Sequence, residues 1–63
     1  MRTWLKDIRN ERGLLQTEVA SKAGISRPFY TMIETGKRNP STKLAKKLAF
    51  ILGFEDRWYL LLE

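Results

Sequence analysis

The sequence predicts an all-α fold, a compact bundle of four to five short helices, from three observations. Apolar residues recur three and four positions apart along most of the chain, which is the spacing of one buried helix face. Glycines stand directly after these apolar segments, where the left-handed backbone that ends a helix favours glycine. Serine and proline stand at the start of two of the segments, which is typical of a helix start.

Length and composition restrict the class of protein. The chain has 63 residues, which allows one domain, residues 1–63. It contains neither cysteine nor histidine, so we expect no disulfide, no metal, no cofactor and no enzymatic activity. No apolar run approaches the roughly 20 residues that span a membrane. Residues 1–13 are too charged for a signal peptide. We therefore expect a protein of a reducing cytoplasm, with no membrane partner.

The segment 16–35 predicts two short helices, over 16–23 and 27–35, joined by a tight turn. Gly24 can end the first helix, and the side-chain oxygen of Ser26 can cap the second. Ala20 is small where the two helices must approach each other. A turn this short makes the helices cross steeply, so the first turn of the second helix faces outward. This is the helix-turn-helix arrangement, whose second helix can enter the major groove of DNA.

One further helix is expected on each side of this segment. The first is expected over about 4–12, with Thr3 as its N-cap and with the first two residues frayed. The other is expected over about 42–52, with Ser41 as its N-cap. Its inward face carries a wide set of apolar residues, namely Leu44, Ala45, Leu48, Ala49, Ile51 and Leu52.

Positive charge gathers in one part of the chain. The net charge is +5. Between residues 19 and 54 the only acid is Glu34, and the basic residues there are Lys22, Arg27, Lys37, Arg38, Lys43, Lys46 and Lys47. Such an uneven distribution is typical of a protein that contacts the phosphate backbone of nucleic acid. The alternative is a solvated basic face that aids solubility.

The chain resembles the phage repressor and Cro type of helix-turn-helix domain, also called the XRE type. The resemblance runs from residue 5 to about residue 54 and rests on LKDIRNERGLLQTEVASKAGIS, IETGKRNPS and AKKLAFILG. It implies a lambda-repressor-like fold that binds double-stranded DNA sequence-specifically, with the recognition helix about Arg27–Thr35 in the major groove. It also implies a repressor that binds a near-palindromic operator as a homodimer, in the cytoplasm of a bacterium or a phage host.

The resemblance places Arg27, Pro28, Thr31 and Met32 at base-contacting positions. Arg27 is the candidate for sequence reading, because its planar fork matches guanine O6 and N7, although it can equally clamp a phosphate. The other three offer little hydrogen bonding and can pack on thymine methyl groups. Phe29 lies between the two faces, either at the edge of the core or against a thymine.

A second set of residues is expected at the DNA backbone: Gln16, Thr17, Ser26, Lys37, Arg38, Asn39 and Lys43. The resemblance implies that Gln16 touches a phosphate beside the recognition helix, where the helix dipole favours an anion. It implies that 37–39 grip phosphates through side chains and backbone N–H groups, which fixes register without reading sequence. The alternatives are an ordinary polar first-turn residue at 16 and a solvated turn at 36–41.

Arg9 is a charged residue beside the inward positions Leu5 and Ile8. The resemblance implies that it pairs with Glu34, at the end of the recognition helix. A half-buried charge needs such a partner, whereas two solvent-exposed charges would contribute little.

The tail EDRWYLLLE is too apolar to be fully exposed. Glu55 or Asp56 can cap a last turn and a half of helix, and part of the tail must cover the core. The rest is a candidate dimer contact, with the residues Trp58, Tyr59, Leu61 and Leu62. The tail also motivates a second functional hypothesis, a protein-interaction module such as an antitoxin or a co-regulator adaptor that binds its partner through this segment.

Overall fold

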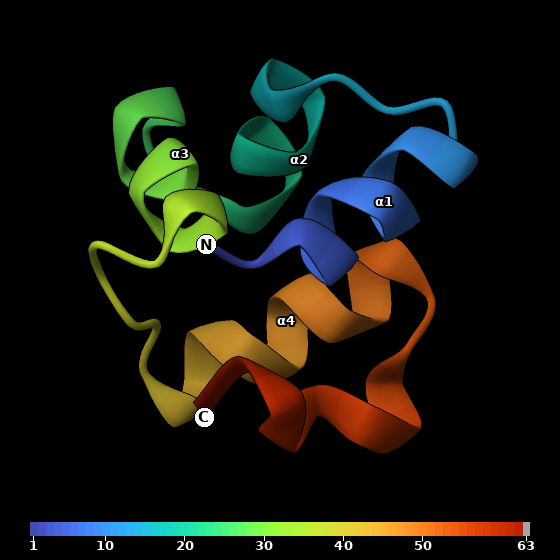
Figure 1. Ribbon diagram of the computed structural model, residues 1–63, viewed down its shortest axis with the longest axis vertical. Helices are drawn as coiled ribbons and strands as arrows, with labels where there is room; N and C mark the ends of the chain where they lie inside the picture. Colours follow the sequence, from blue (N-terminus) through green and yellow to red (C-terminus); the bar gives the residue numbers. More distant parts are fainter. Residues whose placement is uncertain (63) are drawn as a thin grey trace.

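The computed structural model describes residues 1–62, which form four α-helices and one 3₁₀ helix and contain no strand. In chain order these are α1 (Thr3–Glu11), α2 (Gln16–Ala23), α3 (Arg27–Thr35), α4 (Thr42–Leu52) and η1 (Glu55–Leu62) (Figure 1). The predicted all-α fold is confirmed, and the predicted bounds of α2, α3 and α4 agree with the structure residue for residue.

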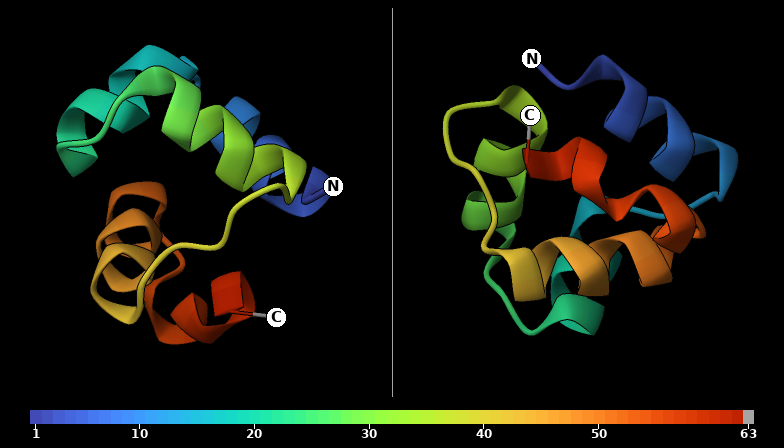
Figure 2. Two further views of the ribbon diagram at one scale, coloured as in Figure 1. Left: turned by 90° about the vertical axis from the view of Figure 1, so that its left-hand side faces the viewer. Right: turned by 90° about the horizontal axis from the view of Figure 1, so that it is seen from below.

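Two layers face each other across an apolar core. In the left panel of Figure 2, α1, α2 and α3 lie above α4 and η1, and the loop 36–41 crosses the front of the view to join the two layers. All five helices contribute fully buried side chains to the core between them. The largest of these side chains are Leu5, Val19, Tyr30, Ile33, Leu48, Leu52 and Leu61. This core fixes α3 against a support while the first turn of α3 remains at the surface.

The start of the chain differs from the prediction. Thr3 is the first residue of α1 and not its N-cap, and the cap position, Arg2, makes no side-chain capping bond. The expected fraying is also wrong, because Arg2 is only 8% exposed. Its guanidinium donates to the carbonyl oxygen of Ile33 at 2.6 Å, to Oδ1 of Asn39 at 2.5 Å and to the carbonyl oxygen of Leu61 at 3.3 Å. Its backbone N–H donates to the carbonyl oxygen of Glu34 at 2.8 Å.

Arg2 therefore forms hydrogen bonds with three segments that are all distant from it in sequence: the end of α3, the loop after it and η1. The last carbonyls of a helix lack partners within the helix and carry partial negative charge, so a cation placed there is stabilising. A guanidinium has five N–H donors in a fixed plane and can satisfy several such acceptors together.

Replacing Arg2 by alanine is expected to lower the free energy of unfolding by about 1–3 kcal/mol, because buried acceptors lose their donors. Urea denaturation measures this change. Lys6→Ala is the matched control, since Lys6 is exposed on α1 and is expected to change stability by less than about 0.5 kcal/mol. Equal stability of the two variants would show that the Arg2 contacts contribute nothing.

The tail folds back along α4 as η1, which is longer than the expected turn and a half and of the tighter 3₁₀ type. The backbone departs from helical geometry at Arg57, where φ is −128° and ψ is 31°. After this bend, Leu61 lies in the core and has no exposed surface. The expected dimer contact at Leu61 is therefore wrong, because Leu61 already packs inside the protein.

The other tail residues lie nearer the surface. Tyr59 is 49% exposed and Leu62 is 42% exposed, while Trp58 is half-buried. The Nζ atom of Lys46 lies 4.8 Å from the centre of the Trp58 ring, a cation–π geometry that covers part of the indole. Within residues 1–62, no helix has both the length and the apolar composition that crossing a bilayer requires.

Candidate nucleic-acid interface

The turn between α2 and α3 presents the first turn of α3 to the outside. Gly24 has a φ of 73°, a left-handed conformation that ends α2 at little cost only for glycine. Ser26 Oγ accepts a hydrogen bond from the N–H of Phe29 at 3.2 Å and so caps α3. Ala20 is 2% exposed at the crossing of the two helices. Arg27 and Pro28 are exposed as a result.

Two adjoining surface hollows lie where the N-terminal ends of α2 and α3 meet. The first, of about 370 Å³, is lined by Gln16, Arg27, Pro28 and Thr31. The second, of about 380 Å³, is lined by Arg9, Leu15, Gln16, Thr17 and Arg27. The structure thus brings together five residues that the sequence analysis proposed for DNA contact, although they come from two helices. Met32, the remaining base-contacting candidate, is half-buried and lines neither hollow.

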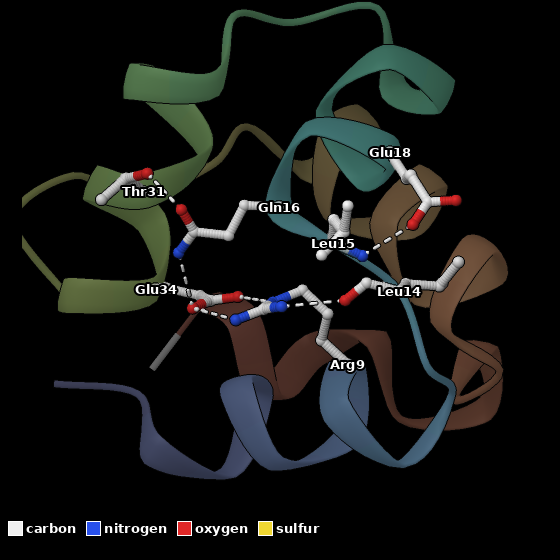
Figure 3. Close-up of polar contacts among 7 residues, drawn as sticks. All are labelled: Arg9, Leu14, Leu15, Gln16, Glu18, Thr31 and Glu34. Carbon is white, nitrogen blue, oxygen red and sulfur yellow. Dashed lines mark hydrogen bonds and ion pairs between the residues drawn. The ribbon is translucent and has the colours of Figure 1, made fainter.

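Beneath these hollows lies a buried ion pair. Arg9 Nε lies 2.6 Å from Glu34 Oε2, and Arg9 Nη1 donates to the carbonyl oxygen of Leu14 at 2.9 Å (Figure 3). Arg9 is 8% exposed and Glu34 is 2% exposed. The pair ties α1 to the end of α3. Because both charged groups are shielded from water, removal of either one would leave the other as a buried charge without a partner.

Gln16 links this pair to the surface of α3 (Figure 3). Its Nε2 donates to Glu34 Oε1 at 3.1 Å, and its Oε1 accepts from the Thr31 hydroxyl at 2.9 Å. The family resemblance implies a phosphate contact for Gln16 and does not indicate these bonds. The polar character of the two residues, on helices that must cross closely, was the only available signal.

Glu34 is charged in the folded protein. Burial by itself would raise its pKa, but the hydrogen bonds from Arg9 and Gln16 favour the charged form, and the pKa lies below the usual value for glutamate. A lowered pKa in the folded state contributes stability above the unfolded-state pKa, and this stability is lost as the pH falls through the folded-state pKa.

We therefore expect the free energy of unfolding to decrease as the pH falls below about 4.5, near the unfolded-state pKa of a glutamate. Glu34→Gln should be less stable than wild type at neutral pH but should show a shallower acid dependence, because it has no proton to gain. Urea titrations at a series of pH values measure both. An identical pH profile for the two proteins would contradict the assignment.

The Tyr30 hydroxyl lies close to the same pair. It is the only buried side-chain polar atom within residues 1–62 that lacks a hydrogen-bond partner of good geometry. Burial raises its pKa, and the neighbouring Glu34 carboxylate adds to this effect. A buried tyrosine hydroxyl usually finds a partner or reaches the surface, and this one does neither.

Tyr30→Phe is expected to change the free energy of unfolding by less than about 1 kcal/mol in either direction, because the hydroxyl it removes has no partner of good geometry. Thermal or urea unfolding checks this. A loss well above 1 kcal/mol would mean that the hydroxyl bonds to Glu34 in solution.

The loop after α3 carries three exposed polar residues, Lys37, Arg38 and Asn39. The backbone N–H groups of Lys37 and Arg38 both donate to the carbonyl oxygen of Met32, at 2.9 and 3.2 Å. These two N–H groups are thus engaged within the protein and are not free to donate to a phosphate. Asn39 Oδ1 likewise accepts a hydrogen bond from Arg2, and the amide nitrogen of the same side chain can still donate.

The remaining candidates for backbone contact are Thr17, Ser26 and Lys43, and all three are exposed. Thr17 stands in the first turn of α2, Ser26 caps α3, and Lys43 stands in the first turn of α4. Among residues 1–62 there is no group of His, Cys, Asp or Glu side chains that could hold a metal ion.

Comparisons with known proteins agree with the helix-turn-helix arrangement of α2 and α3. The sequence profile of a family described as "Helix-turn-helix" matches residues 5–59. The uncharacterized HTH-type transcriptional regulator YqaF of Bacillus subtilis is 49% identical over 63 residues, which cover 100% of this chain and 80% of that protein. The ImmF control region 10 kDa protein of Bacillus phage phi105 is 39% identical over 51 residues, 81% of this chain and 57% of that protein. No solved structure matches the chain.

Proposed function

The chain belongs to the helix-turn-helix family of transcriptional regulators, and from this premise we propose that it binds a specific double-stranded DNA site through α3. The observation that carries the proposal is the hollow between α2 and α3, where Arg27, Pro28 and Thr31 surround Gln16 at the surface. Three of its four lining residues lie between residues 19 and 54, the part of the chain that carries the excess positive charge, which favours an anionic partner. Residues 1–63 would act as one helix-turn-helix domain.

In this proposal α3 enters the major groove with its N-terminal turns toward the bases. Arg27 reads a guanine through O6 and N7, while Pro28 and Met32 pack on thymine methyl groups. Backbone contacts fix the orientation. They come from Gln16, Thr17, Ser26, Lys37, Arg38, Asn39 and Lys43, with the loop residues acting through their side chains.

We further propose that the protein acts as a repressor and binds a near-palindromic operator as a homodimer. The two recognition helices would then lie about 34 Å apart, one turn of the duplex. The exposed side chains of Tyr59 and Leu62, with the partly covered Trp58, are the candidate dimer surface.

Selection from a randomised duplex pool at two salt concentrations tests the proposal. We expect enrichment of a near-palindrome and an affinity that falls with salt by about one unit of log–log slope per phosphate neutralised. Lys37→Ala and Arg38→Ala should each reduce this slope by about one unit without changing the selected sequence. Lys47→Ala, on the exposed face of α4, is the control and should change neither.

Salt-sensitive binding without enrichment would contradict sequence reading. A complete lack of binding at moderate salt would contradict the proposal as a whole and would favour the alternative, a protein-interaction module that uses the tail.

A further inference from the structure

The hydrogen bonds beneath α3 have a fixed direction. The Glu34 carboxylate, charged beside Arg9, can only accept hydrogen bonds. Gln16 therefore turns its amide nitrogen toward Glu34, and the 3.1 Å distance between Nε2 and Oε1 agrees with this orientation. The reverse orientation would place two oxygen acceptors against each other, which is repulsive.

This orientation decides the role of Thr31. The Gln16 Oε1 atom lies 2.9 Å from the Thr31 hydroxyl oxygen, and an amide oxygen only accepts. The Thr31 hydroxyl must then donate its single proton to Gln16. Toward any further partner, the Thr31 hydroxyl oxygen can then only accept a hydrogen bond.

Thr31 also stands where a base would meet it. It lies one turn after Arg27 on α3, it is half-buried, and it lines the same hollow as Arg27 and Gln16. The chain of bonds from Arg9 through Glu34 and Gln16 to Thr31 thus connects a buried charge to the surface at which α3 would approach DNA (Figure 3).

We propose that Thr31 reads its base as a hydrogen-bond acceptor only, and that Gln16 is the positioning residue that imposes this. The inference rests on the proposed binding of duplex DNA. In the major groove, adenine N6 and cytosine N4 are donors, whereas guanine O6 and N7 and thymine O4 are acceptors. The base facing Thr31 is then adenine or cytosine, and guanine is rejected because two acceptors would meet.

The test uses duplexes that carry each of the four bases, in turn, at every position of the selected half-site. The position that Thr31 reads is the one whose preference changes in Thr31→Val, which removes the hydroxyl but keeps the shape. There, wild type should prefer adenine or cytosine to guanine by about threefold to tenfold, the range of one hydrogen bond. Thr31→Ser should retain that preference because it retains the hydroxyl.

Gln16→Leu distinguishes the positioning role from a general contribution to affinity. Loss of a phosphate contact would weaken binding to all four duplexes equally. Loss of the Gln16 oxygen would also free the Thr31 proton, which could then be donated to guanine. The ratio of the affinities for the adenine or cytosine duplex and the guanine duplex should therefore fall toward one, at that position alone. Thr35→Val is the matched control, because the Thr35 hydroxyl donates to the carbonyl oxygen of Met32 within α3.

A wild-type preference for guanine or thymine at that position would overturn the inference, because both bases present acceptors to Thr31. An unchanged base preference in Gln16→Leu would overturn the role of Gln16. A wild-type protein that selects no sequence contradicts the proposed function instead, and thermal unfolding of each variant shows whether it is folded.

Discussion

Replacing Arg9 by alanine is expected to lower the free energy of unfolding by about 3–5 kcal/mol, and Glu34→Ala should have an effect of similar size. Both side chains are nearly inaccessible to solvent, so each single variant leaves a buried charge without its partner. In Arg9→Ala, Glu34 would keep the bond from Gln16 but lose its charged partner, and in Glu34→Ala, Arg9 would still donate to the Leu14 carbonyl without a carboxylate beside it. For a chain of 63 residues, a loss of this size is a large part of a typical total stability.

The double variant Arg9→Ala, Glu34→Ala should be less destabilised than the sum of the two singles, because the second substitution removes the charge that the first left unpaired. Urea denaturation at neutral pH measures all three. Arg12→Ala is the control, since Arg12 is exposed at the end of α1. Small additive effects, no larger than that of Arg12→Ala, would show that the pair behaves as two solvated charges.

The second large effect is expected at the proposed DNA-binding surface. Arg27→Ala should weaken binding to the selected duplex by about 5- to 150-fold, which corresponds to the 1–3 kcal/mol of a bidentate contact with guanine. Discrimination at one base position should be lost together with the affinity. Arg27→Lys should not restore it, because a lysine lacks the planar fork that matches O6 and N7 together.

This experiment also separates the two roles weighed for Arg27. A phosphate contact would give a uniform loss over all sequences and reduce the salt dependence by about one unit of slope. A base contact changes the preference at one position. Lys22→Ala provides the control on α2, because Lys22 is exposed and lines neither hollow. An Arg27→Ala variant that binds like wild type would show that the first turn of α3 lies away from the DNA.

The helices could be predicted from sequence because their ends carry local signals. The bounds of α3 follow from Ser26 and Gly36, and those of α4 from Ser41 and Gly53, since each cap acts within a turn of the helix it limits. The main apolar face of α4 follows in the same way from its periodicity. Phe50 is the exception on that helix, with 70% of its surface exposed on the polar side.

The contacts of Arg2 could not be predicted in this way. Arg2 and Asn39 are separated by 37 positions, and their bond depends on where the loop 36–41 passes after the core has formed. The 3₁₀ form of η1 likewise depends on the bend at Arg57 and on the depth at which Leu61 packs. The bonds of Gln16 to Thr31 and Glu34 require the crossing geometry of α2 and α3, which a pattern of residue types leaves undetermined.

The most direct test of the account is the mapping of backbone amide shifts by NMR as the selected duplex is added. We expect the largest changes at Arg27, Thr31 and Met32 on α3, with further changes at Gln16 and in the loop 37–39. Shift changes confined to η1, around Tyr59 and Leu62, with α3 unaffected, would contradict the proposal that this protein reads DNA through α3.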